Sequence, residues 1–218
     1  MRIRRKPWAL PELSECPFFI KQPLEYRGKW NCQFKRKQPI HLELGCGKGA
    51  FIAKMAARHP EINFIAVDVI SQMLANARRK IIKEFKMSDR EVDNIILVSQ
   101  DVARISQMTD RNDSIDRIYI NFCNPWPRPK HKKRRLTYPD RLRDYQEFLI
   151  DGGEIHFKTD DKDLFYDSLG YFKETGFRII EQTEDLSEVV GEENIMTEHE
   201  IAFRKKGCSI KFLIAKNN

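Results

Sequence analysis

Residues 40–49 read IHLELGCGKG, and this stretch decides the fold. Apolar side chains alternate over its first half, which predicts a buried strand at 40–44. Three glycines follow in a G-x-G-x-G spacing, and apolar side chains then recur at helical intervals over 49–58. Glycines in such a turn let a ligand approach the backbone, and the following helix start supplies free N–H groups. The stretch therefore predicts a ligand site between a strand and a helix.

The alternation of strand and helix continues along the chain. Further strands are predicted at 63–67, 94–98, 114–122 and 152–157, and further helices at 71–86, 139–150 and 162–175, with Ser71 as a helix N-cap. This order implies a parallel sheet with helices on both faces. The last two strands, 177–181 and 209–215, have no clear helix between them and indicate an antiparallel edge hairpin. We expect an α/β fold with a mostly parallel, seven-stranded sheet.

Length and composition indicate one globular domain. The chain has 218 residues, of which 41% are hydrophobic and 33% are charged. Such a length gives one α/β domain a full core and leaves no obvious room for a second. Residues 1–38 form a basic N-terminal arm with four prolines and one expected helical turn, near Pro11–Glu15. Residues 39–218 form the folded domain.

Charge is unevenly distributed along the chain, although the formal net charge is only +7. Residues 128–135 read RPKHKKRR, with six Lys or Arg and one His. Residues 181–203 contain eight acids and no Lys or Arg. So many cations in one short segment cannot be neutralised locally. The pattern indicates one face that binds a polyanion.

Several classes of protein are excluded by simple features. The five cysteines are scattered and form no C-x-x-C pair, which argues against a disulfide framework or a zinc site and indicates the reducing cytoplasm. No His/Cys/Asp cluster has metal-ligand spacing, so no metal is expected. No apolar stretch is long enough for a membrane span, and the basic N-terminus lacks the apolar run of a secretory signal.

Acidic side chains follow three successive strands and predict the kind of ligand. Glu43 precedes Gly45 and Gly47, Asp68 ends the second strand, and Asp101 follows the third. Glu43 would repel a pyrophosphate, and the glycine spacing departs from the dinucleotide G-x-G-x-x-G, so a dehydrogenase is disfavoured. A carboxylate there suits the cationic methionyl group of S-adenosylmethionine. Asp68 is placed to accept both ribose hydroxyls, and Asp101 to contact the adenine amino group.

These residues resemble the class I, Rossmann-like methyltransferase fold, and three further segments narrow the resemblance. Residues 121–137, NFCNPWPRPKHKKRRLT, resemble the signature of the bacterial tRNA (guanine-N7)-methyltransferases, in which Asp-Pro-Trp precedes a basic run. Residues 152–160 (GGEIHFKTD) resemble that family's fifth strand, and residues 197–200 (TEHE) its C-terminal T-x-Y-E. The resemblance extends from about Leu42 to the C-terminus, with the blocks in the family's order.

The resemblance implies methyl transfer from S-adenosylmethionine to N7 of a guanine in tRNA, the variable-loop guanine at tRNA position 46. It implies that Asn124 contacts the cofactor and the reacting groups, and that Asp160 takes part in catalysis and holds the guanine edge. Arg128, Thr197 and Glu200 are the other implied substrate contacts. The basic segment would neutralise tRNA phosphates and set the register of binding through Lys130, His131, Lys132, Lys133, Arg134 and Arg135.

The chain departs from the family pattern at three positions. Asn124 stands for the motif aspartate, His199 for the T-x-Y-E tyrosine, and Arg128 for a common lysine. Asn124 could not act as a proton acceptor. Guanine N7, however, already carries an in-plane lone pair and no proton, so its methylation needs alignment and a dry pocket rather than a general base. We therefore expect activity to survive.

Two alternative functions stay open on the sequence. Asn124-Pro125-Trp126 is also similar to the N-P-P-Y-type motif of methyltransferases that modify exocyclic amines of adenine or cytosine. A non-catalytic RNA-binding protein could keep the same fold, although an intact glycine loop with Asp68 argues against this. The sequence is compatible with either a monomer or a homodimer.

Overall fold

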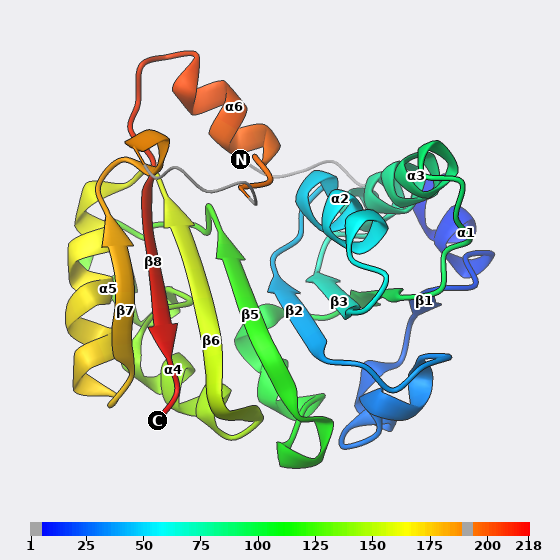
Figure 1. Cartoon of the computed structure of the whole chain (residues 1–218), viewed down its shortest axis with the longest axis horizontal. Coiled ribbons are helices and arrows are strands. Elements are labelled where there is room, and N and C mark those ends of the chain that lie inside the picture. Colours follow the sequence, from blue (N-terminus) through cyan, green and yellow to red (C-terminus); the bar gives the residue numbers. More distant parts are fainter. Residues whose placement is uncertain (1–5, 189–193) are drawn as a thin grey trace.

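The computed structural model describes residues 6–188 and 194–218, and within them eight strands form one sheet. The strand order is β1-β4-β3-β2-β5-β6-β8-β7 (Figure 1). Strands β1 to β6 pair in parallel, whereas β8 lies antiparallel between β6 and β7. The strand bounds are β1 Phe19–Ile20, β2 Ile40–Leu44, β3 Asn63–Asp68, β4 Ile95–Ser99, β5 Ile115–Asn121, β6 Leu149–Thr159, β7 Arg178–Thr183 and β8 Lys211–Lys216.

Helices cover the two faces of the sheet because alternate residues of the central strands enter two separate hydrophobic layers. On β3, Ile65 and Val67 belong to the layer that contains α4 and α5, whereas Phe64 and Ala66 belong to the layer that contains α2 and α3. The helix bounds are α1 Ala9–Ser14, α2 Ala50–Arg58, α3 Ser71–Met87, α4 Pro139–Gln146, α5 Lys162–Glu174 and α6 Glu198–Arg204. None of the helices in the described ranges is long and apolar enough to cross a lipid bilayer.

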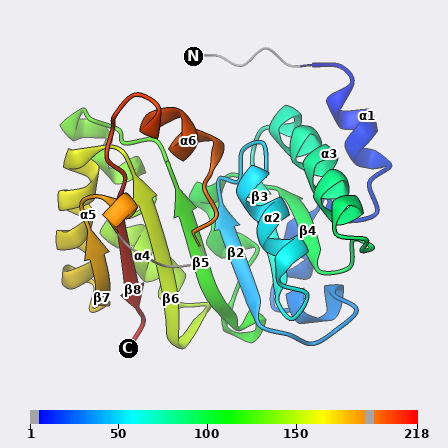
Figure 2. The same ribbon diagram turned by 45° about the horizontal axis from the view of Figure 1, so that its top comes forward.

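The carboxyl ends of the parallel strands meet at one edge of the sheet, where β2 and β5 lie side by side (Figure 1). The chain order reverses there, since β3 and β4 extend from β2 to one side and β6 follows β5 on the other. Open α/β sheets bind their ligands in the crevice at such a reversal. Helix α6 lies beyond the same ends of the strands, as Figure 2 also shows.

The expected α/β fold with an antiparallel pair near one edge is confirmed, and three details are corrected. The sheet has eight strands rather than seven, because Phe19 and Ile20 pair with Leu97 and Val98 of β4. Helix α4 ends at Gln146, and β6 already begins at Leu149. The N-cap of α3 is Ile70 rather than Ser71.

The N-terminal arm packs on the domain at several points. Leu13 of α1 is fully buried in the layer that contains α3, and Glu12 forms ion pairs with Arg78 and Arg79 of that helix. Trp30 is fully buried, and its indole N–H donates to the Met108 carbonyl over 2.7 Å. Burial of these apolar side chains therefore fixes the described part of the arm against the sheet and α3.

Candidate functional site

Glu43 lies near the carboxyl end of β2 and is only 2% exposed. Asn121, at the end of β5, donates from Nδ2 to Glu43 Oε1 over 3.1 Å. Glu43 Oε2 is buried and accepts no hydrogen bond from the described part of the chain. Burial raises the pKa of the Glu43 carboxyl to about 7. A buried acceptor without a donor is costly, so this position suits a ligand that brings a cationic N–H group.

The glycine loop leaves space beside this carboxyl group. Gly45 and Gly47 have φ angles of 79° and 54°, in the left-handed region that favours glycine. A Cβ atom added to either residue would meet nothing within 4 Å. At Gly49 an added Cβ would lie 2.5 Å from the Ala77 side chain, so this glycine lets α2 and α3 approach. The loop therefore combines close helix packing with open space for a ligand.

Asp68 is held in place by the backbone around it. Its Oδ2 accepts from Gly47 N over 3.0 Å, and its Oδ1 accepts from Ile70 N over 2.8 Å. Burial raises the pKa of Asp68 above its ordinary value. Each carboxylate oxygen has a second lone pair, so Asp68 can still accept from two ligand hydroxyls. Asp101 is exposed, and its Oδ1 accepts from Ala103 N over 3.0 Å.

Two adjoining cavities lie at this edge of the sheet. The first, of about 290 Å³, separates the glycine loop from residues 197–199 at the start of α6. The second, of about 510 Å³, is bounded by Asp101 on one side and by Asn124 and Trp126 on the other. Gly45, Asn121 and Phe122 line both cavities. Glu43 lines the first cavity and Asp101 the second. Asp68 lines neither, but it accepts from the backbone of Gly47, which lines the first.

The segment after β5 has a strained backbone. Phe122 and Trp126 have φ angles of 54° and 43°, which residues other than glycine rarely adopt. Each such conformation costs on the order of 1–3 kcal/mol and is characteristic of ligand-binding and catalytic segments. Asn124 is exposed, and its Oδ1 accepts from Trp126 N over 3.1 Å. Asn124 thereby supports the turn that carries the Trp126 ring.

The basic segment divides into exposed and paired cations. Arg128, Lys130, Lys133 and Arg134 are exposed, and Lys133 and Arg134 line the second cavity. The Arg134 guanidinium lies 5.0 Å from the Trp126 ring centroid, and the His131 ring lies 5.8 Å from it. Lys132 forms an ion pair with Asp167 of α5 over 2.6 Å. The exposed cations are placed where a polyanion could reach both them and the cavity.

Arg135 differs from the other cations of the segment. It is 1% exposed, donates from Nε to the Pro125 carbonyl over 2.7 Å, and pairs with Asp167. This placement corrects the sequence-based assignment of Arg135 to RNA contact. Its guanidinium instead joins the 124–126 turn to α5, so Arg135 is a structural residue of the site.

Comparison with known proteins identifies the family. A family profile described as "Putative methyltransferase" matches residues 37–213. A tRNA (guanine-N(7)-)-methyltransferase of Clostridium perfringens is 54% identical, over 99% of each chain. The protein of that name from Acetivibrio thermocellus is 51% identical, again over 99% of each chain. The chain belongs to this methyltransferase family.

A solved structure supports the fold independently. An antibiotic-related methyltransferase superimposes with a TM-score of 0.56 and covers 100% of this chain and 96% of its own, at 18% identity. Sequence identity at this level reflects a shared fold alone. The class I methyltransferase fold expected from the glycine loop and the strand-end acids is thereby confirmed.

In this methyltransferase Asp160 follows β6, the strand next to β5. The neighbouring Asp161 caps α5, because its Oδ1 accepts from Leu164 N over 2.7 Å. Asp160 is half-buried, and within residues 6–188 and 194–218 its carboxyl group accepts no hydrogen bond. The N-cap of α5 is therefore Asp161, and Asp160 takes no part in capping this helix.

The C-terminal motif of the methyltransferase lies in α6. Thr197 lines the first cavity and caps α6 by accepting from Glu200 N over 3.0 Å. Glu200 is fully buried and accepts from Arg204 and Asn194, with Lys158 Nζ 3.5 Å from its Oε2. A direct contact between Glu200 and a base would require α6 to move.

Three residues of the site escaped the sequence analysis. Asn121 and Phe122 line both cavities, and the buried Lys158 pairs with Glu200. Asn121 could have been predicted as a site residue, because it is a polar residue at the end of the buried strand β5, as Asp68 is at the end of β3. Lys158 gave no such signal, since a single lysine in a strand is ordinarily a solvent-facing residue.

Proposed function

We propose that this protein transfers a methyl group from S-adenosylmethionine to N7 of a guanine in tRNA. The observation that carries the proposal is the buried Glu43 Oε2, which has no hydrogen-bond partner in the described part of the chain and lies beside the open glycine loop. A cationic amine is the ligand group that would satisfy it. The family membership adds the reaction class, and the names of the relatives supply the tRNA substrate and the N7 target.

The residues around the two cavities fit this cofactor. Glu43 would accept from the ammonium group, Asp68 from the ribose hydroxyls, and Asp101 from the adenine amino group. Gly45 and Gly47 would let the cofactor lie against the backbone. When bound, S-adenosylmethionine supplies a methyl group on a positively charged sulfur. The protein must therefore align a nucleophile with that group and exclude water.

Guanine N7 attacks with its in-plane lone pair, so one carbon–nitrogen bond forms as the carbon–sulfur bond breaks. No proton leaves N7, and the step requires no general base. The purine ring becomes cationic, and the Asn124 side-chain carbonyl would lie near that developing charge. Asp160 would accept from the N1–H and N2 amino groups of guanine, an edge that adenine lacks. Arg128 and Thr197 are the further proposed substrate contacts.

The surface beside the cavities fits a nucleic-acid substrate. Lys130, Lys133 and Arg134 would neutralise phosphates, with His131 beside them and Lys132 partly engaged by Asp167. These contacts would fix the register of the tRNA without reading its sequence. By family resemblance, the target is the variable-loop guanine at tRNA position 46.

Nucleoside mass spectrometry tests the proposal. Unmodified tRNA is incubated with the protein and S-adenosylmethionine, digested and analysed for methylated nucleosides. Formation of 7-methylguanosine supports the proposal. Formation of a methylated adenosine or cytidine would support the exocyclic-amine alternative, and no product at all would support a non-catalytic RNA-binding protein.

A further inference from the structure

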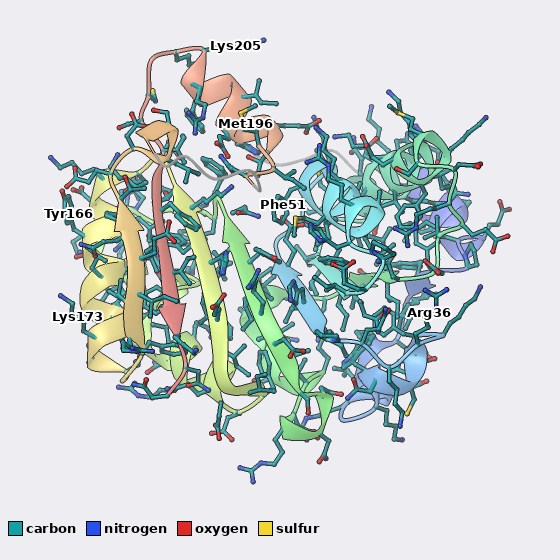
Figure 3. The ribbon with its side chains drawn as sticks, viewed as in Figure 1. Arg36, Phe51, Tyr166, Lys173, Met196 and Lys205 are labelled. Atoms are coloured by element: carbon teal, nitrogen blue, oxygen red, sulfur yellow. The ribbon has the colours of Figure 1, made fainter. Side chains whose placement is uncertain are left out.

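Helix α6 forms one wall of the first cavity. Thr197, Glu198 and His199 face residues 45–50 of the glycine loop and the start of α2 across it. The helix lies beyond the carboxyl ends of the parallel strands (Figures 1 and 2). Met196 and Lys205 mark its two ends in Figure 3, where Phe51 is labelled on α2. A ligand held by the glycine loop would therefore lie between the sheet edge and α6.

Three contacts attach α6 to three separate elements around this cavity. Glu198 forms an ion pair with Lys80 of α3. The His199 ring stacks on Phe122, at the end of β5, with centroids 5.9 Å apart and planes inclined by 20°. Glu200 pairs with Lys158 of β6. These contacts together hold α6 across the mouth of the cavity.

The two ion pairs differ in burial and therefore in the ease with which they can open. Glu200 is fully buried and the Lys158 side chain is 9% exposed, so separating them would leave a buried charge without a partner. Lys80 and Glu198 are 30% and 49% exposed, so each can be rehydrated when they separate. The Glu200 side of α6 is the fixed attachment, and the Glu198 side is the one that can release.

We propose that Lys80 is a positioning residue for cofactor retention, because its ion pair with Glu198 holds the releasable side of α6 over the cofactor cavity. The proposal rests on the proposed function, in which that cavity takes S-adenosylmethionine. Lys80 itself lies outside the lining of the cavity and acts through Glu198. Loss of the ion pair should therefore speed cofactor dissociation. A substitution of Lys80 achieves this without changing a residue that lines the cavity.

The preceding residue of α3 provides a matched control. Arg79 pairs with Glu12 of α1 over 2.6 Å and is also partly exposed, but its partner lies in the N-terminal arm rather than in α6. Lys80→Glu and Arg79→Glu change the charge of the same helix by the same amount. Only the first variant places two like charges between α3 and α6.

The test measures the dissociation rate of S-adenosylmethionine by stopped-flow displacement with excess S-adenosylhomocysteine, without tRNA. Lys80→Glu should raise the rate about five- to tenfold, because an attraction becomes a repulsion. The double variant Lys80→Glu/Glu198→Lys restores an attraction between α3 and α6 and should therefore lower the rate below that of Lys80→Glu. The dissociation rate of Arg79→Glu should stay within about twofold of the wild type. Lys80→Met, which removes the attraction without adding a repulsion, should raise the rate about two- to fivefold.

Two results would overturn the proposal. One is a wild-type dissociation rate in both Lys80→Glu and Lys80→Met. The other is an equal increase in Arg79→Glu, which would attribute the effect to the net charge of α3. Unfolding temperatures of all variants check that the fold is intact, and Lys80→Met replaces Lys80→Glu if the latter does not fold. Failure of the wild type to bind the cofactor would instead contradict the proposed function.

Discussion

Asn121 donates a hydrogen bond to Oε1 of Glu43 across the boundary between β5 and β2, at 3.1 Å. Oε2 of the same carboxyl group has no partner among residues 6–188 and 194–218. The single donor compensates only part of the desolvation, and the pKa of Glu43 is about 7. Without a ligand, the neutral form of Glu43 is therefore favoured below pH 7. Binding of a cationic amine requires the carboxylate.

Affinity for S-adenosylmethionine should consequently fall as pH falls from 7.5 to 5.5. In this window the protein must release a proton from Glu43 on binding, which weakens binding by up to about tenfold per pH unit. Isothermal titration calorimetry in buffers of different ionisation enthalpy measures both the affinity and the released proton. Glu43→Gln should bind S-adenosylmethionine more weakly, and its affinity should no longer depend on pH in this window. Asp68→Asn should also bind more weakly, but its affinity should still fall as pH falls below 7. A wild-type affinity independent of pH would contradict the assigned role of Glu43.

A second pH effect should appear in stability rather than binding. His41 is buried in β2 beside the Tyr119 hydroxyl, and burial lowers the pKa of His41 to about 3. The unfolded state takes up this proton near pH 6.5, so stability is present above pH 6.5 and is lost as pH falls toward 3. His41 should therefore contribute a decrease in the free energy of unfolding of up to about 1.4 kcal/mol per pH unit below 6.5. Glu43 acts in the opposite direction, because its raised pKa adds stability as pH falls below 7.

Denaturant unfolding between pH 7 and 5 measures this slope. His41→Phe should remove the His41 contribution from this slope. The contributions of His156, whose pKa is also lowered by burial, and of Glu43 remain in the variant. His59→Gln is the control, since His59 lies outside the sheet, and it should keep the wild-type slope. Identical slopes in the wild type and His41→Phe would show that His41 is not neutral in the folded protein.

Neighbouring cations of the basic segment should respond differently to substitution. Replacing Lys133 and Arg134 by Ala should weaken tRNA binding and flatten the plot of log affinity against log salt by up to about two contacts. Arg135→Ala should instead lower the free energy of unfolding by about 1–3 kcal/mol, because the Pro125 carbonyl and Asp167 lose a buried donor. Filter binding over a salt series and denaturant unfolding separate the two effects. If the salt dependence of tRNA affinity were unchanged in the Lys133/Arg134 variant, these two residues would be ordinary solvent-exposed cations that do not contact tRNA.

The contrast between these cations shows where sequence reasoning succeeded and failed. The spacing of apolar residues along the sequence predicted β2 to β6 and the helices between them. Each of these elements has a buried face, so its apolar residues recur every two residues in a strand and every 3.6 residues in a helix. The order of the acids along the sequence placed Glu43, Asp68 and Asp101 at the ends of three neighbouring strands, with Glu43 and Asp101 in the linings of the two cavities. Charge density in 128–135, however, could not separate exposed Arg134 from buried Arg135, since burial depends on where Asp167 of α5 lies.

Long-range partners account for the other differences. Phe19 and Ile20 form an eighth strand only because the edge of β4 is available to them, and two residues carry no periodic signal. Glu200 belongs to an acidic stretch of the sequence and was assigned to substrate contact, yet it is fully buried and pairs with Lys158 and Arg204. Residues 189–193 of that segment lie outside the described residues. The division of the chain into an N-terminal arm and a folded domain at residue 38 stays a prediction, as does a cytoplasmic location.

The substitution of Asn124 for the family's aspartate makes the chemistry testable. If this position shapes the pocket and supports the Trp126 turn, Asn124→Asp should preserve turnover or raise it modestly. Any gain would come from a full negative charge near a base that becomes cationic. Single-turnover methyl transfer to one purified tRNA at saturating cofactor compares the two forms. A rescue of about 10²-fold or more by Asp would mean that the position must accept a proton, contrary to our account.

The most direct test of the central claim removes the N7 atom itself. A tRNA transcript prepared with 7-deazaguanosine in place of guanosine has a C–H group at that position and no lone pair, while its exocyclic amines and phosphates are unchanged. We predict that the protein binds this transcript with the affinity of the guanosine transcript, within about threefold. Methyl transfer from S-adenosylmethionine should be abolished on the deaza transcript and readily measured on the normal one. Equal methyl transfer to both transcripts would contradict N7 of guanine as the acceptor.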